Sequence, residues 1–153
     1  MEQIRLDHQL PVKKTDHTSK GDQPKWKQAG NWYKADHMGY EALSEIIVSR
    51  LLAWSDADDF VSYQPVRIHY NGKVVSGCSS RDFMRKGEML IPFERLHRAY
   101  EGRGLAQTLT RVDSPTARIA YTVDFVERVT NLTGVGAYLT SILELDCLTL
   151  NED

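Results

Sequence analysis

The sequence predicts an α+β protein, with an antiparallel sheet and one helix in the first part and only helices in the second. A run with helical spacing of apolar residues stands between short aromatic and β-branched runs in the first half. Asn71-Gly72 separates two of these runs and indicates a hairpin, because both residues tolerate positive φ. From Pro92 onward, apolar residues recur only at helical spacing. We therefore expect two regions, residues 1–87 and 88–153.

The first region is expected to begin with a polar lead-in, residues 1–9, and a short strand at Pro11 and Val12. The polar stretch 13–27 contains a glycine and a proline, which is typical of a loop. Trp32-Tyr33-Lys34 then indicates a strand, because aromatic residues favour that conformation. Further strands are expected at 60–63, 66–70 and 73–76.

An amphipathic helix is expected over residues 40–54. Apolar residues follow helical spacing on one face, at Leu43, Ile46, Ile47, Leu51 and Trp54. The opposite face is half apolar, with Glu41, Glu45, Val48 and Leu52. A helix that is apolar on both sides is usually packed on both sides, so we expect neighbours on each.

The second region is expected to hold four helices. Their approximate ranges are 93–100, 105–110, 115–129 and 138–145. Ser114-Pro115 is a helix start, and Gly134 and Gly136 should interrupt the chain before the last helix. That last helix is so apolar that it needs neighbours on most sides, which indicates either a further segment after residue 153 or a partner chain.

The composition excludes several classes of protein. The formal net charge is -2, whereas generic nucleic-acid and anionic-membrane binders carry a basic excess. The two cysteines fit no disulfide framework, and there is neither a signal-peptide core nor an apolar run long enough to span a membrane. We expect a cytoplasmic protein without nucleic-acid or membrane partners.

The histidines and cysteines offer no strong site. The five histidines are not spaced like a zinc pair, so no metal site is expected from them. Cys78 stands in a turn-like Gly-Cys-Ser-Ser run but has no evident histidine partner. Its strand-like surroundings indicate a small buried thiol.

The loop before the aromatic strand is a candidate phosphate site. Residues 19–25 combine a flexible glycine with hydroxyl, amide and lysine side chains, at Ser19, Lys20, Gly21, Gln23 and Lys25. Backbone N–H groups freed by a glycine can hold phosphate oxygens. The stretch is neither a Walker loop nor the glycine-rich kinase loop, and a plain solvated loop is the alternative interpretation.

Lys34 strengthens the phosphate interpretation. It stands on the aromatic strand just before a helix with Glu41 and Glu45. A kinase uses a strand lysine to hold ATP phosphates and a helix glutamate to hold that lysine. The alternative is an outward-facing lysine beside a solvated helix face.

These segments, in this order, resemble the HipA-like family of bacterial serine/threonine kinases. The resemblance rests on Ser-Lys-Gly-Asp-Gln-Pro-Lys-Trp at 19–26, Trp-Tyr-Lys-Ala-Asp at 32–36 and Gly-Tyr-Glu-Ala-Leu-Ser-Glu at 39–45. The terminal Leu-Asn-Glu-Asp at 150–153 looks like the start of the family's catalytic segment. The match covers nearly all of the chain after about residue 10 and is most specific between residues 32 and 45.

The resemblance implies a role for each matching residue. Lys34 would be the ATP-phosphate lysine, with Glu41 as its helix partner and Glu45 as the reserve candidate. The loop 19–25 would lie near the phosphates, and Gly77 to Arg81 would pass near the adenine. Asp153 would be the catalytic aspartate that orients the substrate hydroxyl.

The resemblance also implies what the complete protein needs. The family's Mg²⁺ ligands, an asparagine and a further aspartate, follow the catalytic aspartate, so this chain matches a first lobe with the start of a second lobe and is expected to be inactive alone. The implied cofactors of the complete protein are ATP and Mg²⁺. The implied partners are a protein substrate, a small antitoxin-like protein and the remaining part of the second lobe.

Two other interpretations stay open. A kinase-like first lobe without metal ligands could be a non-catalytic binding module or a truncated regulator of a toxin–antitoxin system. A plain α+β domain with a surface lysine and no nucleotide function is the third.

Overall fold

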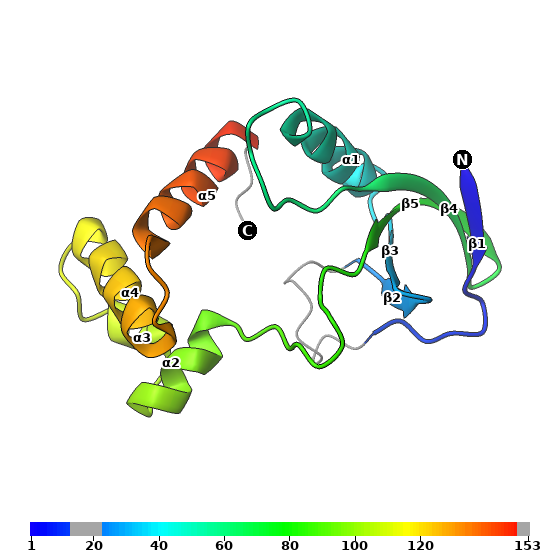
Figure 1. Ribbon diagram of the computed structural model, residues 1–153. Helices are drawn as coiled ribbons and strands as arrows, with labels where there is room; N and C mark the ends of the chain where they lie inside the picture. Colours follow the sequence, from blue (N-terminus) through cyan, green and yellow to red (C-terminus); the bar gives the residue numbers. More distant parts are fainter. Residues whose placement is uncertain (13–22, 150–153) are drawn as a thin grey trace. The chain divides into compact units, whose positions relative to one another are not determined.

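The computed structural model describes residues 1–12 and 23–149 (Figure 1). It divides into two compact units, Met1–Met89 and Leu90–Asp153. The first unit contains a sheet and one helix, and the second contains helices, so the expected α+β class is confirmed. No helix in the described part of the chain is long and apolar enough to cross a membrane.

The first unit is built on a five-stranded sheet with the order β1-β4-β5-β3-β2. Its strands are β1 (Glu2–Arg5), β2 (Lys25–Gln28), β3 (Asn31–Ala35), β4 (Gln64–Tyr70) and β5 (Lys73–Arg81). The β2–β3, β3–β5 and β4–β5 pairs are antiparallel as expected, whereas β1 joins β4 in parallel. Asn71 and Gly72, with φ of 50° and 70°, form the predicted hairpin turn between β4 and β5.

Four expectations for the strands are wrong. Pro11 and Val12 form no strand, and residues 25–27, expected in a loop, belong to β2. Residues 1–9 are not only a polar lead-in, since Glu2–Arg5 forms β1 and Leu6 is fully buried in the core. The strand is too short to show a readable alternation in sequence, and its place comes from pairing with β4. Residues 60–63 are not a strand, because β4 begins only at Gln64.

One face of the sheet carries the apolar core of the first unit. Its buried members come from β2, β3, β4 and the segment just after β1, and they are Leu6, Trp26, Tyr33, Ala35, Val66 and Ile68. Burial of each large side chain contributes about 1.5–3 kcal/mol. The Trp26 indole N–H donates to the carbonyl of Gln9 at 3.1 Å, so the segment after β1 is tied to β2.

Helix α1 (Glu41–Leu52) lies against the sheet with its small residues. Ala42 and Ser49 are its buried residues, whereas Leu43 is 58% exposed and Trp54, beyond its end, 85%. The expectation that the stripe of Leu43, Ile47, Leu51 and Trp54 would be packed is therefore wrong within the described residues. Small side chains let the helix approach the sheet closely, and this approach brings the Glu45 face toward β3.

The second unit contains α2 (Phe93–Glu101), α3 (Leu105–Leu109), α4 (Pro115–Thr130) and α5 (Val135–Thr149). Ser114 caps α4 as predicted, because its hydroxyl accepts from the N–H of Ala117 at 3.1 Å. Gly136 does not interrupt the chain, since α5 already begins at Val135.

A fully buried histidine lies in the core of the second unit. His97 Nδ1 is 2.7 Å from the carbonyl oxygen of Arg103, and Nε2 is 2.8 Å from the hydroxyl of Tyr121. A carbonyl only accepts, so Nδ1 donates to it. The ring also packs on Phe125, with 4.7 Å between ring centroids.

Candidate functional site

The face of the sheet opposite the apolar core carries a row of functional side chains. Lys25 on β2 lies directly opposite Lys34 on β3, and Lys34 lies directly opposite Cys78 on β5. Directly opposite residues project to the same face, so these three side chains are neighbours. Helix α1 contacts β4 and β5, and its Glu45 reaches this face.

Lys34 is held by two side chains. Its ammonium Nζ forms an ion pair with Glu45 Oε1 and donates to the Tyr63 hydroxyl at 2.9 Å. Nζ also lies 4.6 Å from the centroid of the Tyr63 ring, within cation–π range. The lysine side chain is only 16% exposed, so its charge is largely removed from water.

The protonation of this cluster follows from its contacts. Burial acts to lower the pKa of Lys34, but the hydrogen bonds and charge of Glu45 and the Tyr63 hydroxyl outweigh it and raise the pKa above its usual value. Burial raises the pKa of Tyr63, partly opposed by Lys34. At neutral pH Lys34 is therefore an ammonium and Tyr63 a neutral phenol.

The expected pairing of Lys34 with Glu41 is not what the structure shows. Lys34 pairs with Glu45, the reserve candidate, which is one turn further along α1. The Glu41 carboxylate instead accepts from four backbone N–H groups before the helix, those of His37, Met38, Gly39 and Tyr40, at 2.8–3.3 Å. Backbone N–H groups at the start of a helix lack carbonyl partners, and Glu41 supplies acceptors there.

Asp36 fixes the start of α1 relative to β3. Its carboxylate accepts from the N–H of Ala42 at 2.7 Å, and its own N–H donates to the carbonyl of Ser76 at 2.9 Å. The turn between Lys34 and Glu45 is thereby tied to both the helix and β5. Sequence reasoning missed this residue, although an aspartate just after a strand and before a helix is a typical capping signal.

Only part of the predicted phosphate loop can be placed. Ser19, Lys20 and Gly21 lie outside the described residues, as does Asp153. Lys25 is buried in β2 with 5% exposure. Gln23 Nε2 is buried and has no hydrogen-bond partner among the described residues.

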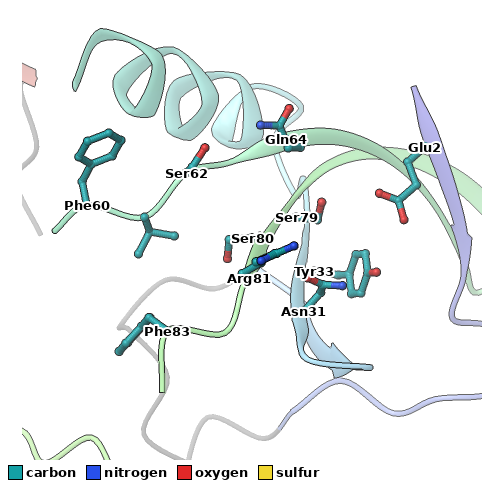
Figure 2. Close-up of a pocket in the computed structure, with 11 residues that line it drawn as sticks. Glu2, Asn31, Tyr33, Phe60, Ser62, Gln64, Ser79, Ser80, Arg81 and Phe83 are labelled. Atoms are coloured by element: carbon teal, nitrogen blue, oxygen red, sulfur yellow. The ribbon is translucent and has the colours of Figure 1, made fainter. Parts of the chain in front are cut away.

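A pocket of about 460 Å³ lies at the end of β5 (Figure 2). β4 begins at Gln64, opposite Ser79, while β5 continues to Arg81, so β5 has no β4 partner at its last residues. Ser80 projects to the same side as Phe60 and Phe83, whereas Tyr33 and Glu2 lie on the other side. By the strand alternation, Ser80 shares the face of Lys34.

Asp82 anchors the end of this pocket. Its carboxylate forms an ion pair with Lys27 and accepts from the Trp32 indole N–H at 3.2 Å. Its backbone N–H donates to the carbonyl of Gly30 at 2.9 Å. These contacts join the end of β5 to the β2–β3 hairpin.

Cys78 is a buried thiol, as expected from sequence. Burial raises its pKa to about 12, so it is protonated at neutral pH and is a poor nucleophile. Its neighbour Gly77 lies so close to β3 that an added Cβ would be 2.4 Å from the carbonyl oxygen of Lys34. Within residues 1–12 and 23–149, no three histidine, cysteine or acidic side chains are grouped to hold a metal ion.

The comparisons with known proteins identify no relative: no family model, no curated protein and no solved structure matches the chain. The site must therefore be interpreted from its own geometry.

Proposed function

We propose that the first unit binds ATP through Lys34 and is the first lobe of a HipA-like kinase that phosphorylates serine or threonine in a protein substrate. The observation that carries the proposal is the lysine on β3 held by a carboxylate from α1. Phosphoryl transfer depends on positioning and charge, and a strand lysine fixed by a helix glutamate is the arrangement that kinases use for the phosphates.

The charge pattern supports an anionic ligand. Lys25 and Lys34 lie directly opposite each other, so two cationic side chains project to the same face of the sheet. A polyphosphate can accept charge-assisted hydrogen bonds from ammonium groups. The buried Gln23 Nε2, two residues before Lys25, adds a donor in the same segment.

The pocket at the end of β5 supports a place for the base. The backbone N–H of Asp82 donates to Gly30 in the β2–β3 hairpin. Backbone groups of successive strand residues point in alternate directions, so the N–H and C=O of Arg81 point to the opposite edge of β5. β4 does not pair with this part of that edge. Phe60 and Phe83 add flat apolar walls. Ser80 is two residues beyond Cys78, which lies opposite Lys34. Two strand residues span roughly 7 Å, so the base near Ser80 and the phosphates near Lys34 could belong to one nucleotide.

The described residues offer ligands for the phosphates but no group of ligands for the metal ion. In a kinase, bound Mg²⁺ would supply positive charge that neutralises the phosphates. The described residues supply no acidic cluster for it, and Asp153 lies outside them. The proposal therefore assigns Lys34, Lys25 and Gln23 to the phosphates and assigns no residue of the described part to Mg²⁺. Both cysteines are free thiols, in keeping with the cytoplasmic location that we propose.

The test is ATP binding by the 153-residue chain, measured by isothermal titration calorimetry without metal. Lys34→Met should weaken ATP binding at least about tenfold, because a charge-assisted hydrogen bond contributes roughly 1.5–3 kcal/mol. Lys73→Ala is the matched control, since Lys73 is exposed at the β4–β5 turn. ATP binding that survives Lys34→Met unchanged would contradict the proposal.

A second candidate function rests on the exposed face of α1. Leu43, Ile47 and Leu51 are 48–58% exposed in a single stripe, and such apolar stripes mark protein-binding surfaces. We propose a protein partner there, of the antitoxin or regulator type, if the chain does not bind nucleotide. Ile47→Glu should then abolish partner binding while Lys34→Met leaves it intact, and the reverse result would contradict this second candidate.

A further inference from the structure

We propose that Tyr63 is the positioning residue of Lys34: with Glu45 it occupies two of the three ammonium N–H groups and directs the third toward the incoming anion. The identity of that anion as the phosphates of ATP rests on the proposed function. The positioning itself rests on contacts within the chain.

The first step is the donor count. A lysine ammonium has three N–H donors and no acceptor. Glu45 takes one donor and the Tyr63 hydroxyl takes another at 2.9 Å. Since the donors are arranged tetrahedrally, fixing two of them fixes the direction of the third. With Glu45 alone, the flexible side-chain torsions of Lys34 could shift Cε and Nζ around that single contact, and the direction of the remaining donors would be less well fixed.

The second step is the support of Tyr63 itself. Its backbone N–H donates to Ser49 Oγ at 3.2 Å, and Ser49 Oγ donates to the carbonyl of Ile46 at 3.0 Å. Ser49 is 5% exposed and lies one turn after Glu45 on α1. The same helix face therefore holds both partners of Lys34, one directly and one through the segment before β4.

The third step is the state of the phenol. Burial keeps the Tyr63 hydroxyl protonated by raising its pKa, and its contact with Glu45 acts in the same direction. Tyr63 can thus accept from Lys34 and donate to Glu45 in one closed cluster. The ring beneath Nζ adds cation–π attraction, which a phenylalanine would retain. Replacement of tyrosine by phenylalanine therefore isolates the hydroxyl.

The test compares the wild-type chain with Tyr63→Phe. Proton–nitrogen NMR of the lysine ammonium groups should show Lys34 as a slowly exchanging signal, and in Tyr63→Phe its hydrogen exchange should rise at least about threefold. Affinity for inorganic tripolyphosphate should fall about tenfold. Tyr100→Phe is the control, because Tyr100 is 61% exposed on α2.

The outcomes separate this inference from the proposed function. An unchanged Lys34 signal in Tyr63→Phe would overturn the inference, whatever the chain binds. A changed signal in a chain that binds neither tripolyphosphate nor ATP would support the positioning and overturn the proposed function. If Tyr63→Phe does not fold, Ser49→Ala should give the same faster exchange by loosening the Tyr63 backbone, and its failure to do so would also overturn the inference.

Discussion

Two buried polar groups, one in each unit, illustrate different uses of the same chemistry. His97 has a partner at each ring nitrogen, and both partners belong to the protein. Within residues 1–12 and 23–149, Lys34 has two side-chain partners, Glu45 and Tyr63, for three donors. A polar group whose hydrogen-bonding atoms all have partners within the protein stabilises the fold. A remaining donor on a fixed ammonium makes it a place for a ligand.

The largest effect is expected from removal of the saturated group. His97→Ala deletes a fully buried ring and two hydrogen bonds, which should destabilise the second unit by about 3 kcal/mol. The three tryptophans, Trp26, Trp32 and Trp54, all lie in the first unit. In urea unfolding followed by circular dichroism, the transition of the second unit should move to lower urea concentration, whereas the affinity for ATP should stay unchanged. If His97→Ala abolished ATP binding while the helical content stayed unchanged, the result would contradict the assignment of His97 as a purely structural group.

A smaller effect on stability, with a clear effect on binding, is expected at Glu45. Glu45→Ala leaves the largely buried Lys34 without its charge partner, which should cost about 2 kcal/mol in the first unit, read by tryptophan fluorescence, and weaken ATP binding about tenfold.

The neighbouring Glu41 is the matched control for Glu45. Glu41→Ala removes the acceptor of the N–H groups before α1 and should cost about 1 kcal/mol, with ATP affinity unchanged. Equal effects of the two substitutions on ATP affinity would contradict the assignment of Glu45 as the lysine's partner.

The smallest effect is expected in the pH dependence of the first unit. The pKa of Lys34 is raised in the folded state, so the lysine's contribution to stability is complete below its unfolded value and is lost as pH rises through the folded value. Tyr63, with its raised pKa, acts in the same direction. Stability of the first unit should therefore fall as pH climbs above about 10, and Lys34→Met should flatten this fall. An equally steep fall in Lys34→Met would place the cause in other groups.

Local signals predicted most of the fold. The predicted helix over 40–54 is observed as Glu41–Leu52, and Asn71-Gly72 forms the predicted hairpin turn. These elements depend on neighbours in sequence. β1 was missed because its stability comes from pairing with β4, more than 60 residues away by the register of Glu2 with Val66.

The burial of α1 could not be predicted from periodicity. Apolar residues on both faces suggested neighbours on each side, but only the face with Ala42, Ser49 and the partner of Lys34 lies on the sheet. Periodicity shows where apolar residues lie on a helix, but it does not show which face carries the carboxylate that pairs with a largely buried lysine on the sheet.

The site was predictable in part. A strand lysine followed by helix glutamates pointed to Lys34, and the structure brings that lysine to Glu45. The choice between Glu41 and Glu45 depends on where the backbone N–H groups before α1 find acceptors, which no spacing shows. Tyr63 lies 29 residues after Lys34, so its contact arises only from the folded sheet.

Gly77 has a consequence for evolutionary history. Any side chain at this position would collide with the backbone of Lys34, since an added Cβ would lie 2.4 Å from its carbonyl oxygen. A mutation there moves the lysine itself. In any lineage that keeps the lysine for its purpose, the glycine should be inherited together with it, and the pair forms a signature by which distant descendants of the same ancestor could be recognised after the rest of the sequence has diverged.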